Sequence, residues 1–287
     1  MRHRLDRFNI SYESEPDGIN IVLSSFFNTN CTPHYGKLSN NIECKAKAIN
    51  SFNNEDFIIK QAEIDDLIYL QKRGISENTL QIFLPYIKTI KSKNSKYNFL
   101  NIGFPYTEYD KNTLKGMEVV NYNWKRHAKG SDKTNSAWFA KTGNGVVTNI
   151  FFSESAIDAM SYYQLYSHRI NKESSIFIST GGVMSESQVK EILYKNPYAR
   201  INTAFDKDLT GNIYDIRLAL IKEKKTVAII KKKMTVEFQF KNEKYELPFE
   251  AVTLTNFRKV TKFRTSVNVQ KPSFGKDFNE MLQRKSH

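Results

Sequence analysis

Residues 147–166 read VTNIFFSESAIDAMSYYQLY and carry the clearest structural pattern in the chain. The run from Val147 to Phe152 is short, mostly apolar and bounded by turn residues, which is typical of a buried parallel strand. Downstream of it, Ala156, Met160 and Tyr163 recur at the spacing of one helix face. A strand that leads directly into an amphipathic helix predicts the βα unit of an α/β fold.

The same alternation continues further along the chain. Residues 175–179 and 201–205 favour two more strands, and each is followed by a segment with helical periodicity. Ser185 and Gln188 form the capping-box pair expected where the first of these helices begins. The pattern predicts right-handed crossovers and a mostly parallel sheet flanked by helices.

The flanking regions break this alternation. Residues 61–85 favour helices interrupted at Gly74, and residues 98–125 favour short strands, so we expect an N-terminal α+β subdomain. Residues 226–262 alternate apolar and polar side chains, as in a β-hairpin insertion. The expected divisions are an N-terminal segment of unknown role at 1–60, with one strand near 19–23, the subdomain at 61–145 and the α/β domain at 146–287.

Composition narrows the class of protein. The chain has 287 residues, a formal net charge of +13 and a pI of about 9.5. Such charge indicates a polyanionic partner, most often nucleic acid; the alternative is codon bias toward Lys and Asn. Two cysteines cannot form a disulfide framework, and no run approaches ~18 apolar residues. We therefore expect a cytoplasmic protein without a signal peptide, a membrane span or a membrane partner.

Three carboxylates directly follow predicted strands. Glu154 comes after the first strand, and Asp206 and Asp208 come after residues 201–205. Because ligands of parallel sheets gather outside the carboxyl ends of the strands, these acids should share one edge. Carboxylates at positions i and i+2 of an extended segment point the same way and repel unless a cation lies between them. Oxygen ligands without Cys or His favour Mg²⁺ or Mn²⁺.

Each acid also has an ordinary interpretation. A D-x-D pair is common on surface turns, and a Glu after a strand often serves the N-terminus of the next helix. Their joint placement favours a functional site, because Gly181-Gly182 ends the strand between them. Gly211 then starts the following helix, whose free amides could contact a phosphate.

The residues around these acids resemble a known family. The stretch FSESAIDAMS (152–161) resembles the E-G-x-x-D-A-x-S signature of the Toprim domain in bacterial primases, and FDKDLTG (205–211) resembles its D-x-D-x-x-G motif. STGG (179–182) resembles the family's glycine turn, and GKDFNE (275–280) resembles its closing K-D-x-[DN]-E element. Upstream, YLQKRGI (69–75) resembles the segment that precedes Toprim in bacterial replicative primases. The resemblance implies a Toprim-like core with a primase-like N-terminal subdomain.

The resemblance also implies roles for the acids. It makes Glu154 a general base or metal-adjacent carboxylate, and Asp158 supports it from one helical turn further on. It makes Asp206 and Asp208 the Mg²⁺ ligands and Asp277 an outer ligand. The backbone turns of such a site would lie at Gly181, Gly182 and Gly211.

A further set of residues is basic or aromatic and would border the site in a primase-like arrangement. Its cations suit phosphate contacts, and its rings could stack bases. The alternative is that the tryptophans belong to the core and the lysines are solvated. The set comprises Arg73, Tyr122, Trp124, Lys125, Arg126, Lys129 and Lys133.

The resemblance implies an enzyme that acts on nucleic acid with Mg²⁺ or Mn²⁺. Its closest form is a primase-like nucleotidyltransferase that uses NTPs on single-stranded DNA. Similar chains occur on plasmids and conjugative transposons, so a role in the replication or transfer of a mobile element, with a helicase or relaxase partner, is expected. The alternatives are a Toprim nuclease and a non-catalytic DNA-binding accessory protein with a relict site.

Overall fold

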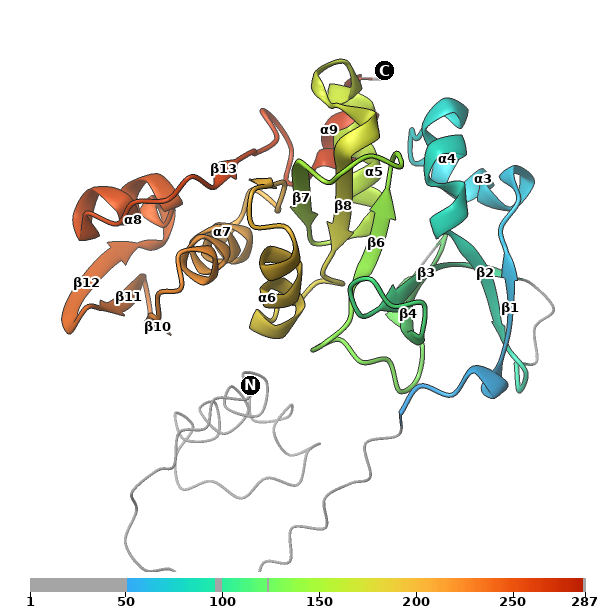
Figure 1. Cartoon of the computed structure of the whole chain (residues 1–287), viewed down its shortest axis with the longest axis horizontal. Coiled ribbons are helices and arrows are strands. Elements are labelled where there is room, and N and C mark those ends of the chain that lie inside the picture. The colour runs from blue at the N-terminus through green and yellow to red at the C-terminus, as the bar shows by residue number, and fades with distance from the viewer. Residues whose placement is uncertain (1–50, 96–99, 123, 286–287) are drawn as a thin grey trace, which may run out of the picture. The chain divides into compact units, whose positions relative to one another are not determined.

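The structure is a computed structural model that describes residues 51–95, 100–122 and 124–285 (Figure 1). The strand expected near residues 19–23 lies outside this part of the chain. The described residues belong to one compact unit. None of their helices is long and apolar enough to cross a bilayer.

A five-stranded sheet in the order β13-β9-β7-β8-β6 forms the centre of the fold. Strand β7 pairs in parallel with β8 and β9, β9 pairs in parallel with β13, and β6 runs antiparallel to β8. With helices on both faces, this sheet confirms the α/β class. Its strands are β6 (Trp138–Lys141), β7 (Asn149–Ser153), β8 (Ser175–Ser179), β9 (Arg200–Thr203) and β13 (Asn268–Val269).

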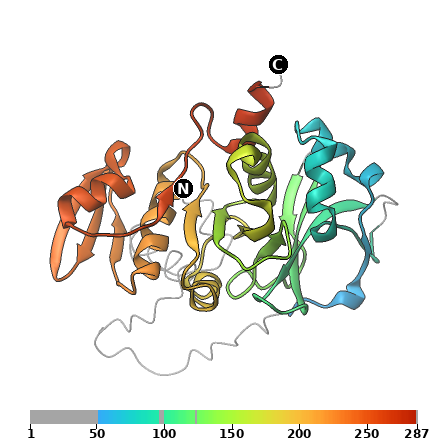
Figure 2. The ribbon, with the colours of Figure 1, turned by 45° about the horizontal axis from the view of Figure 1, so that its top comes forward.

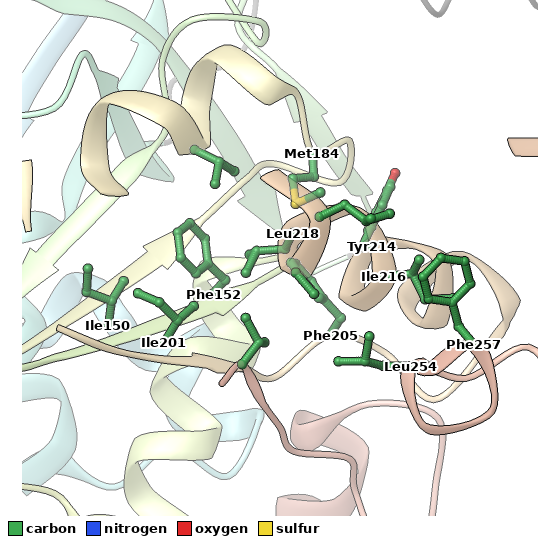
Figure 3. Close-up of a cluster of buried hydrophobic side chains, with 14 of the residues drawn as sticks. Ile150, Phe152, Met184, Ile201, Phe205, Tyr214, Ile216, Leu218, Leu254 and Phe257 are labelled. Carbon is green, nitrogen blue, oxygen red and sulfur yellow. The ribbon is translucent and has the colours of Figure 1, made fainter. Parts of the chain in front are cut away.

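The alternation of side chains along β7 feeds two separate cores. Ile150 and Phe152 pack into one apolar cluster with residues of the helices α6 and α7 (Figure 3). Phe151 points to the opposite face and packs with residues of α5 in the second cluster. Because the strand is covered on both faces, its apolar run is continuous. The helices are α5 (Ala156–Tyr166), α6 (Glu186–Lys195) and α7 (Leu209–Lys222).

Side-chain caps fix the starts of these three helices. The hydroxyl of Ser155 accepts from the Asp158 N–H, and that of Ser185 accepts from the Gln188 N–H. Asp208 Oδ1 accepts from the Gly211 N–H at 2.9 Å. Each cap satisfies an amide that would otherwise have no partner in the first helical turn. The helix starts therefore follow from local sequence.

A second, antiparallel sheet precedes the central one, in the order β1-β2-β3-β4-β5. Helices α3 (Ile68–Lys72) and α4 (Glu77–Phe83) accompany it, separated at Gly74, which has a φ of +83°. This interruption agrees with the break expected from the sequence. The strands are β1 (Phe57–Gln61), β2 (Lys88–Ser92), β3 (Asn101–Thr107), β4 (Leu114–Asn121) and β5 (Trp124–His127).

The expected hairpin insertion is larger than a hairpin. Strands β11 (Thr235–Phe240) and β12 (Glu243–Pro248) form it, but β10 (Ala228–Lys231) adds a third strand and α8 (Leu254–Thr261) adds a helix. The Phe257 ring covers Phe238 and Phe240 at centroid distances of 5.1 and 5.7 Å, so the helix buries the apolar face of the hairpin. This group lies at the opposite end of the unit from β1–β5 (Figure 1 and Figure 2). Helix α9 (Phe278–Lys285) ends the described chain and packs on α5.

Trp138 joins the two large sheets. Its ring is fully buried between Phe83 and Phe104, at centroid distances of 6.0 and 5.9 Å. Its indole N–H donates to the carbonyl oxygen of Tyr86 at 2.8 Å. A single side chain on β6 thus contacts both the helical pair and the antiparallel sheet.

We expect Trp138→Ala to lower the free energy of unfolding by about 3–5 kcal/mol, because it leaves a cavity and an unpaired carbonyl. Urea denaturation followed by circular dichroism measures this loss. Tyr198→Ala is the control, since Tyr198 is 99% exposed and should shift stability by less than about 0.5 kcal/mol. Equal stability of the Trp138 variant and the wild type would contradict the role of this ring.

Candidate active site

The carboxyl ends of the central strands bring four of the five predicted acids to one cavity, and the fifth, Asp208, is not among the residues that line it. Glu154 follows β7 directly, and Asp206 comes three residues after the end of β9. These two acids line a cavity of about 430 Å³ together with Asp158 of α5 and Asp277, which precedes α9. Acids far apart in the sequence therefore share one wall.

A glycine turn fixes the backbone that carries Glu154. The N–H of Gly182 donates to the Glu154 carbonyl oxygen at 2.9 Å. Gly181 and Gly182 have φ values of +71° and +93°, a region that favours glycine. A Cβ atom at Gly181 would lie 2.2 Å from the Tyr106 hydroxyl oxygen, so this position has no room for a side chain. These contacts explain why two glycines stand beside the acidic site.

Two neighbours hold the carboxylate of Asp158, which is 8% exposed. The Ser155 hydroxyl donates to Oδ2, and the backbone N–H of Asn279 donates to Oδ1 at 3.3 Å. Burial first, and then the nearby charge of Asp277, raise the pKa of Asp158 to about 7. Asp158 is thus a positioned acid in the wall of the cavity.

Glu154 lacks a compensating charge. Burial, followed by the charges of Asp206, Asp208 and Asp158, raises its pKa to about 8. Its Oε1 atom is buried and accepts no hydrogen bond from the described residues. A carboxyl group in this position holds its proton near neutral pH unless a cation approaches.

An ammonium group lies between the paired aspartates. Lys276 Nζ is 3.2 Å from Asp206 Oδ2 and 3.5 Å from Asp208 Oδ2. The loop that carries Lys276 is docked through its carbonyl oxygen, which accepts from the Lys207 N–H at 2.7 Å. At Gly211 a Cβ atom would lie 2.2 Å from the Asp206 carbonyl oxygen, so glycine permits the close turn after the pair. The repulsion expected between the two carboxylates is relieved here by a lysine.

Residues 151–240 match a family model described as Toprim-like. The chain carries a Toprim-like domain. The matched segment contains Glu154, Asp158, Asp206 and Asp208, so the resemblance seen in the sequence is confirmed there. No curated protein matches the chain.

Two solved structures show distant similarity to the chain. One is the primase fragment of the bacteriophage T7 primase-helicase protein, with 16% identity, 87% of this chain and 79% of that chain covered, and a TM-score of 0.45. The other is a complex of bacteriophage T7 lagging-strand DNA polymerase with primase domains bound to an RNA/DNA hybrid and dTTP. Its match has 18% identity, covers 60% of this chain and 80% of that chain, and has a TM-score of 0.37.

Four of the seven residues predicted to bind nucleic acid line the cavity of the Toprim acids. They are Arg73, Tyr122, Trp124 and Lys125. Arg126 and Lys129 line a different cavity, to which Trp124 also contributes, and Lys133 is exposed outside both. Side chains alternate along β5, so Lys125 and the adjacent Arg126 point to opposite faces of the sheet.

Asn279 and Lys276 contribute to the site, although neither of them was assigned a role from the sequence. The Asn279 side chain is fully buried, donates to the Arg73 carbonyl and to the Ser161 hydroxyl, and accepts from Arg73 Nε at 2.6 Å. It therefore ties Arg73 to α5 and α9. Lys276 was identifiable only as the neighbour of Asp277 in the GKDFNE run, because its partners lie about seventy residues upstream.

The donor set of the Toprim site fits a hard divalent cation, as Toprim domains generally bind. Across residues 51–95, 100–122 and 124–285, no group of three or more His, Cys, Asp or Glu side chains is already arranged around a metal position. The acids are nevertheless all oxygen donors, and they raise one another's pKa. The unpartnered Glu154 Oε1 also lacks the positive charge that such an ion would supply.

We expect the metal-free protein to lose stability as the pH rises from about 4.5 to 8. The pKa of Glu154 is raised from 4.5 to about 8 in the folded state. In that window the unfolded chain has released a proton that the folded chain still binds, so folding becomes less favourable as pH increases. Glu154→Gln should remove this contribution, which is at most about 1.4 kcal/mol per pH unit.

The measurement is the unfolding free energy of both proteins in chelator at pH 5 and pH 8. The advantage of the Gln variant over the wild type should grow with pH. Excess Mg²⁺ should reduce that advantage, because a bound cation favours the ionised carboxylate. Parallel pH profiles for the two proteins would rule out this interpretation of Glu154.

Proposed function

We propose that the chain is a primase-like nucleotidyltransferase that joins nucleotides on a single-stranded DNA template with Mg²⁺ or Mn²⁺. The observation that carries this proposal is the cavity whose acids, Glu154, Asp158 and Asp206, face the cations Arg73 and Lys125. Acids suit a divalent ion and a hydroxyl proton, and cations suit phosphates. The resemblance of residues 69–75 to the segment that precedes Toprim in primases favours priming over other Toprim chemistries.

The proposed reaction joins a 3′-hydroxyl oxygen to the α-phosphorus of an incoming nucleotide. The new P–O bond replaces the bond to pyrophosphate, and the hydroxyl proton must leave. Glu154 lines the cavity, and its carboxylate can accept that proton. With a pKa raised to about 8, Glu154 would act as this base once a nearby divalent ion favours its ionised form.

Asp206 and Asp208 would hold the divalent ion, with Asp277 further out. When bound, such an ion neutralises charge on the phosphoryl oxygens. Asp158 is fixed by Ser155 and Asn279, so its carboxyl group keeps its place in the wall beside Glu154. The docked loop of Lys276 keeps the aspartate pair compensated in the absence of the ion.

The template would bind along the opposite wall of the cavity. The ring of Tyr122 is 53% exposed, and the Lys72 ammonium lies 5.0 Å from its centroid. An exposed ring beside a cation can stack a base whose phosphate meets the charge. We extend the proposal to NTPs as substrates and to a helicase or relaxase as a partner in the replication or transfer of a mobile element.

The central test is synthesis of short oligoribonucleotides from labelled NTPs on single-stranded DNA with Mg²⁺. Glu154→Gln should reduce this synthesis by at least about 100-fold, because it removes the proton acceptor. Glu186→Gln is the matched control, since Glu186 is exposed on α6 and pairs with Lys190 at 2.7 Å. It should retain wild-type synthesis.

Other outcomes would replace the proposal. Degradation of the DNA without synthesis, lost in Glu154→Gln, would indicate a Toprim nuclease. DNA binding without any chemistry, and indifferent to Asp206→Asn and to chelator, would indicate an accessory protein with a relict site.

Lys276 should compete with the divalent ion for the aspartate pair. We expect Lys276→Met to tighten Mn²⁺ binding by about tenfold, because it removes a positive charge near the same oxygens. Isothermal titration calorimetry with Mn²⁺ alone measures this change without any turnover. Lys207→Met is the control: Lys207 stands between the two aspartates in the sequence, but its ammonium lies 3.4 Å from the Ser273 carbonyl oxygen. Weaker Mn²⁺ binding by the Lys276 variant would contradict the competition.

A further inference from the structure

Glu118 is a buried carboxylate for which the proposed chemistry has no use. It lies on β4 with 1% of its surface exposed, and burial raises its pKa. Its Oε1 atom lies 3.2 Å from the ammonium of Lys125, and this ion pair opposes the rise. Burial of a carboxylate lowers the stability of a fold unless fixed partners compensate it, so we asked what Glu118 does at this position.

A chain of polar groups holds the second oxygen of Glu118. The Tyr106 hydroxyl donates to Glu118 Oε2 at 3.3 Å, and His127 Nδ1 lies 3.2 Å from the same hydroxyl. Burial, with the charges of Lys133 and Lys125, lowers the pKa of His127 to about 4, so its ring is neutral. A neutral ring protonated at Nδ1 donates to Tyr106, and the donors then run in one direction toward the carboxylate.

Strand register puts this network behind the wall of the Toprim cavity. Glu118 pairs with His127, and Val120 pairs with Lys125, so these four side chains share one face of the antiparallel sheet. Val120 and Lys125 line the cavity, whereas Glu118 is buried beside them. The Tyr106 hydroxyl also meets the Gly181 turn, where a Cβ atom would lie 2.2 Å from it.

The ammonium of Lys125 pairs with a buried carboxylate on one side and is open to the cavity on the other. Its side chain is 45% exposed, and its charge lowers the pKa of Asp158 across the cavity. Lysine side chains lose considerable rotamer freedom when they bind a ligand. A fixed carboxylate behind the ammonium removes part of that loss in advance.

We propose that Glu118 is a positioning residue that holds the Lys125 ammonium at the cavity wall, where it binds a phosphate group of nucleotide or nucleic acid. The inference rests on the proposed function for its ligand class. The acids that face Lys125 would repel any anionic ligand. A phosphate ligand is favoured over a carboxylate because a nucleotide carries a bound cation, which offsets that repulsion, and a nucleobase, which adds contacts. Tyr106 and His127 complete the support from behind.

The test is a double-mutant cycle on the full chain with Glu118→Gln, Lys125→Met and the double variant. Binding of ATP with Mg²⁺ is measured by calorimetry, and binding of a labelled single-stranded oligonucleotide is measured by fluorescence anisotropy over a series of salt concentrations. Each ligand is added alone, so no synthesis occurs. The two arms distinguish a nucleotide phosphate from a nucleic-acid phosphate.

Lys125→Met should weaken at least one ligand by about tenfold or more, since it removes a charge-assisted contact. Glu118→Gln should weaken the same ligand by about three- to tenfold, since the ammonium is no longer ordered. In the double variant the Glu118 change should add nothing. If DNA supplies the phosphate, Lys125→Met should also reduce the slope of log affinity against log salt by about 0.7.

Two controls separate positioning from folding. Lys88→Met removes a lysine of β2 whose ammonium is held by Gln61 Oε1 at 2.6 Å, in the same sheet but outside this cavity, and should leave both affinities unchanged. Tyr106→Phe keeps the ion pair and removes one support, so it should weaken binding by about two- to threefold. This variant carries the test if Glu118→Gln does not fold.

The inference would be overturned if Glu118→Gln bound both ligands as tightly as the wild type. It would also be overturned if Glu118→Gln weakened binding by the same factor in the Lys125→Met background, because Glu118 would then act only on the fold. The inference would also be overturned if the wild-type protein bound neither ATP nor the oligonucleotide. The proposed function has a separate readout. Synthesis that persists while the cycle fails disproves only the positioning role, and a successful cycle without synthesis disproves only the primase-like activity.

Discussion

Repulsion among carboxylates gathered at the ends of parallel strands is the constraint on which this structure depends. Glu154, Asp158 and Asp206 approach one another because β7 and β9 are neighbours in the sheet. The backbone has no freedom to separate them, since the glycine turn and the helix caps fix each position. The negative charge must then be met by protons, by lysines or by a metal ion, and the raised pKa of Glu154 reflects the first of these.

Two lysines near the acids, Lys276 and Lys271, have different roles. Lys276 lies between two aspartates, and Lys271 donates to the carbonyl oxygens of Phe205 and Asp206 while pairing with the buried Asp215 at 2.9 Å. Lys271 therefore stabilises the strand end itself, whereas Lys276 stabilises the functional groups. The ion pair of Lys271 with Asp215 is buried and structural, whereas the ammonium of Lys276 is exposed and can exchange its partners.

Local sequence was sufficient wherever a signal lay within one element. The strand at 175–179 has the predicted bounds, and the helix predicted from Ala156, Met160 and Tyr163 spans 156–166, because continuous apolar runs and side-chain caps act over a few residues. The strand predicted at 201–205 ends earlier, at Thr203, so Asp206 lies on the turn rather than directly at the strand end.

Side-chain contacts that depend on sheet register could not be predicted from the sequence. Glu118 meets Lys125 only because β4 and β5 pair in one particular alignment, and no local pattern specifies it. By contrast, the separation of Lys125 from Arg126 was predictable, since adjacent residues of a strand face opposite sides. The hairpin at 226–262 was recognised from alternation, but the helix that covers it was not, because its apolar face has meaning only against Phe238 and Phe240.

The placement of Trp138 has a kinetic consequence. Because the indole packs against Phe83 and Phe104 and donates to the Tyr86 carbonyl oxygen, it links β6 of the central sheet to the helix α4 and the antiparallel sheet. The Lys276 side chain is 59% exposed, so its ammonium can leave the aspartate pair by a change of rotamer, which takes picoseconds to nanoseconds. Access to the acids is thereby separated from the far slower breathing of the fold.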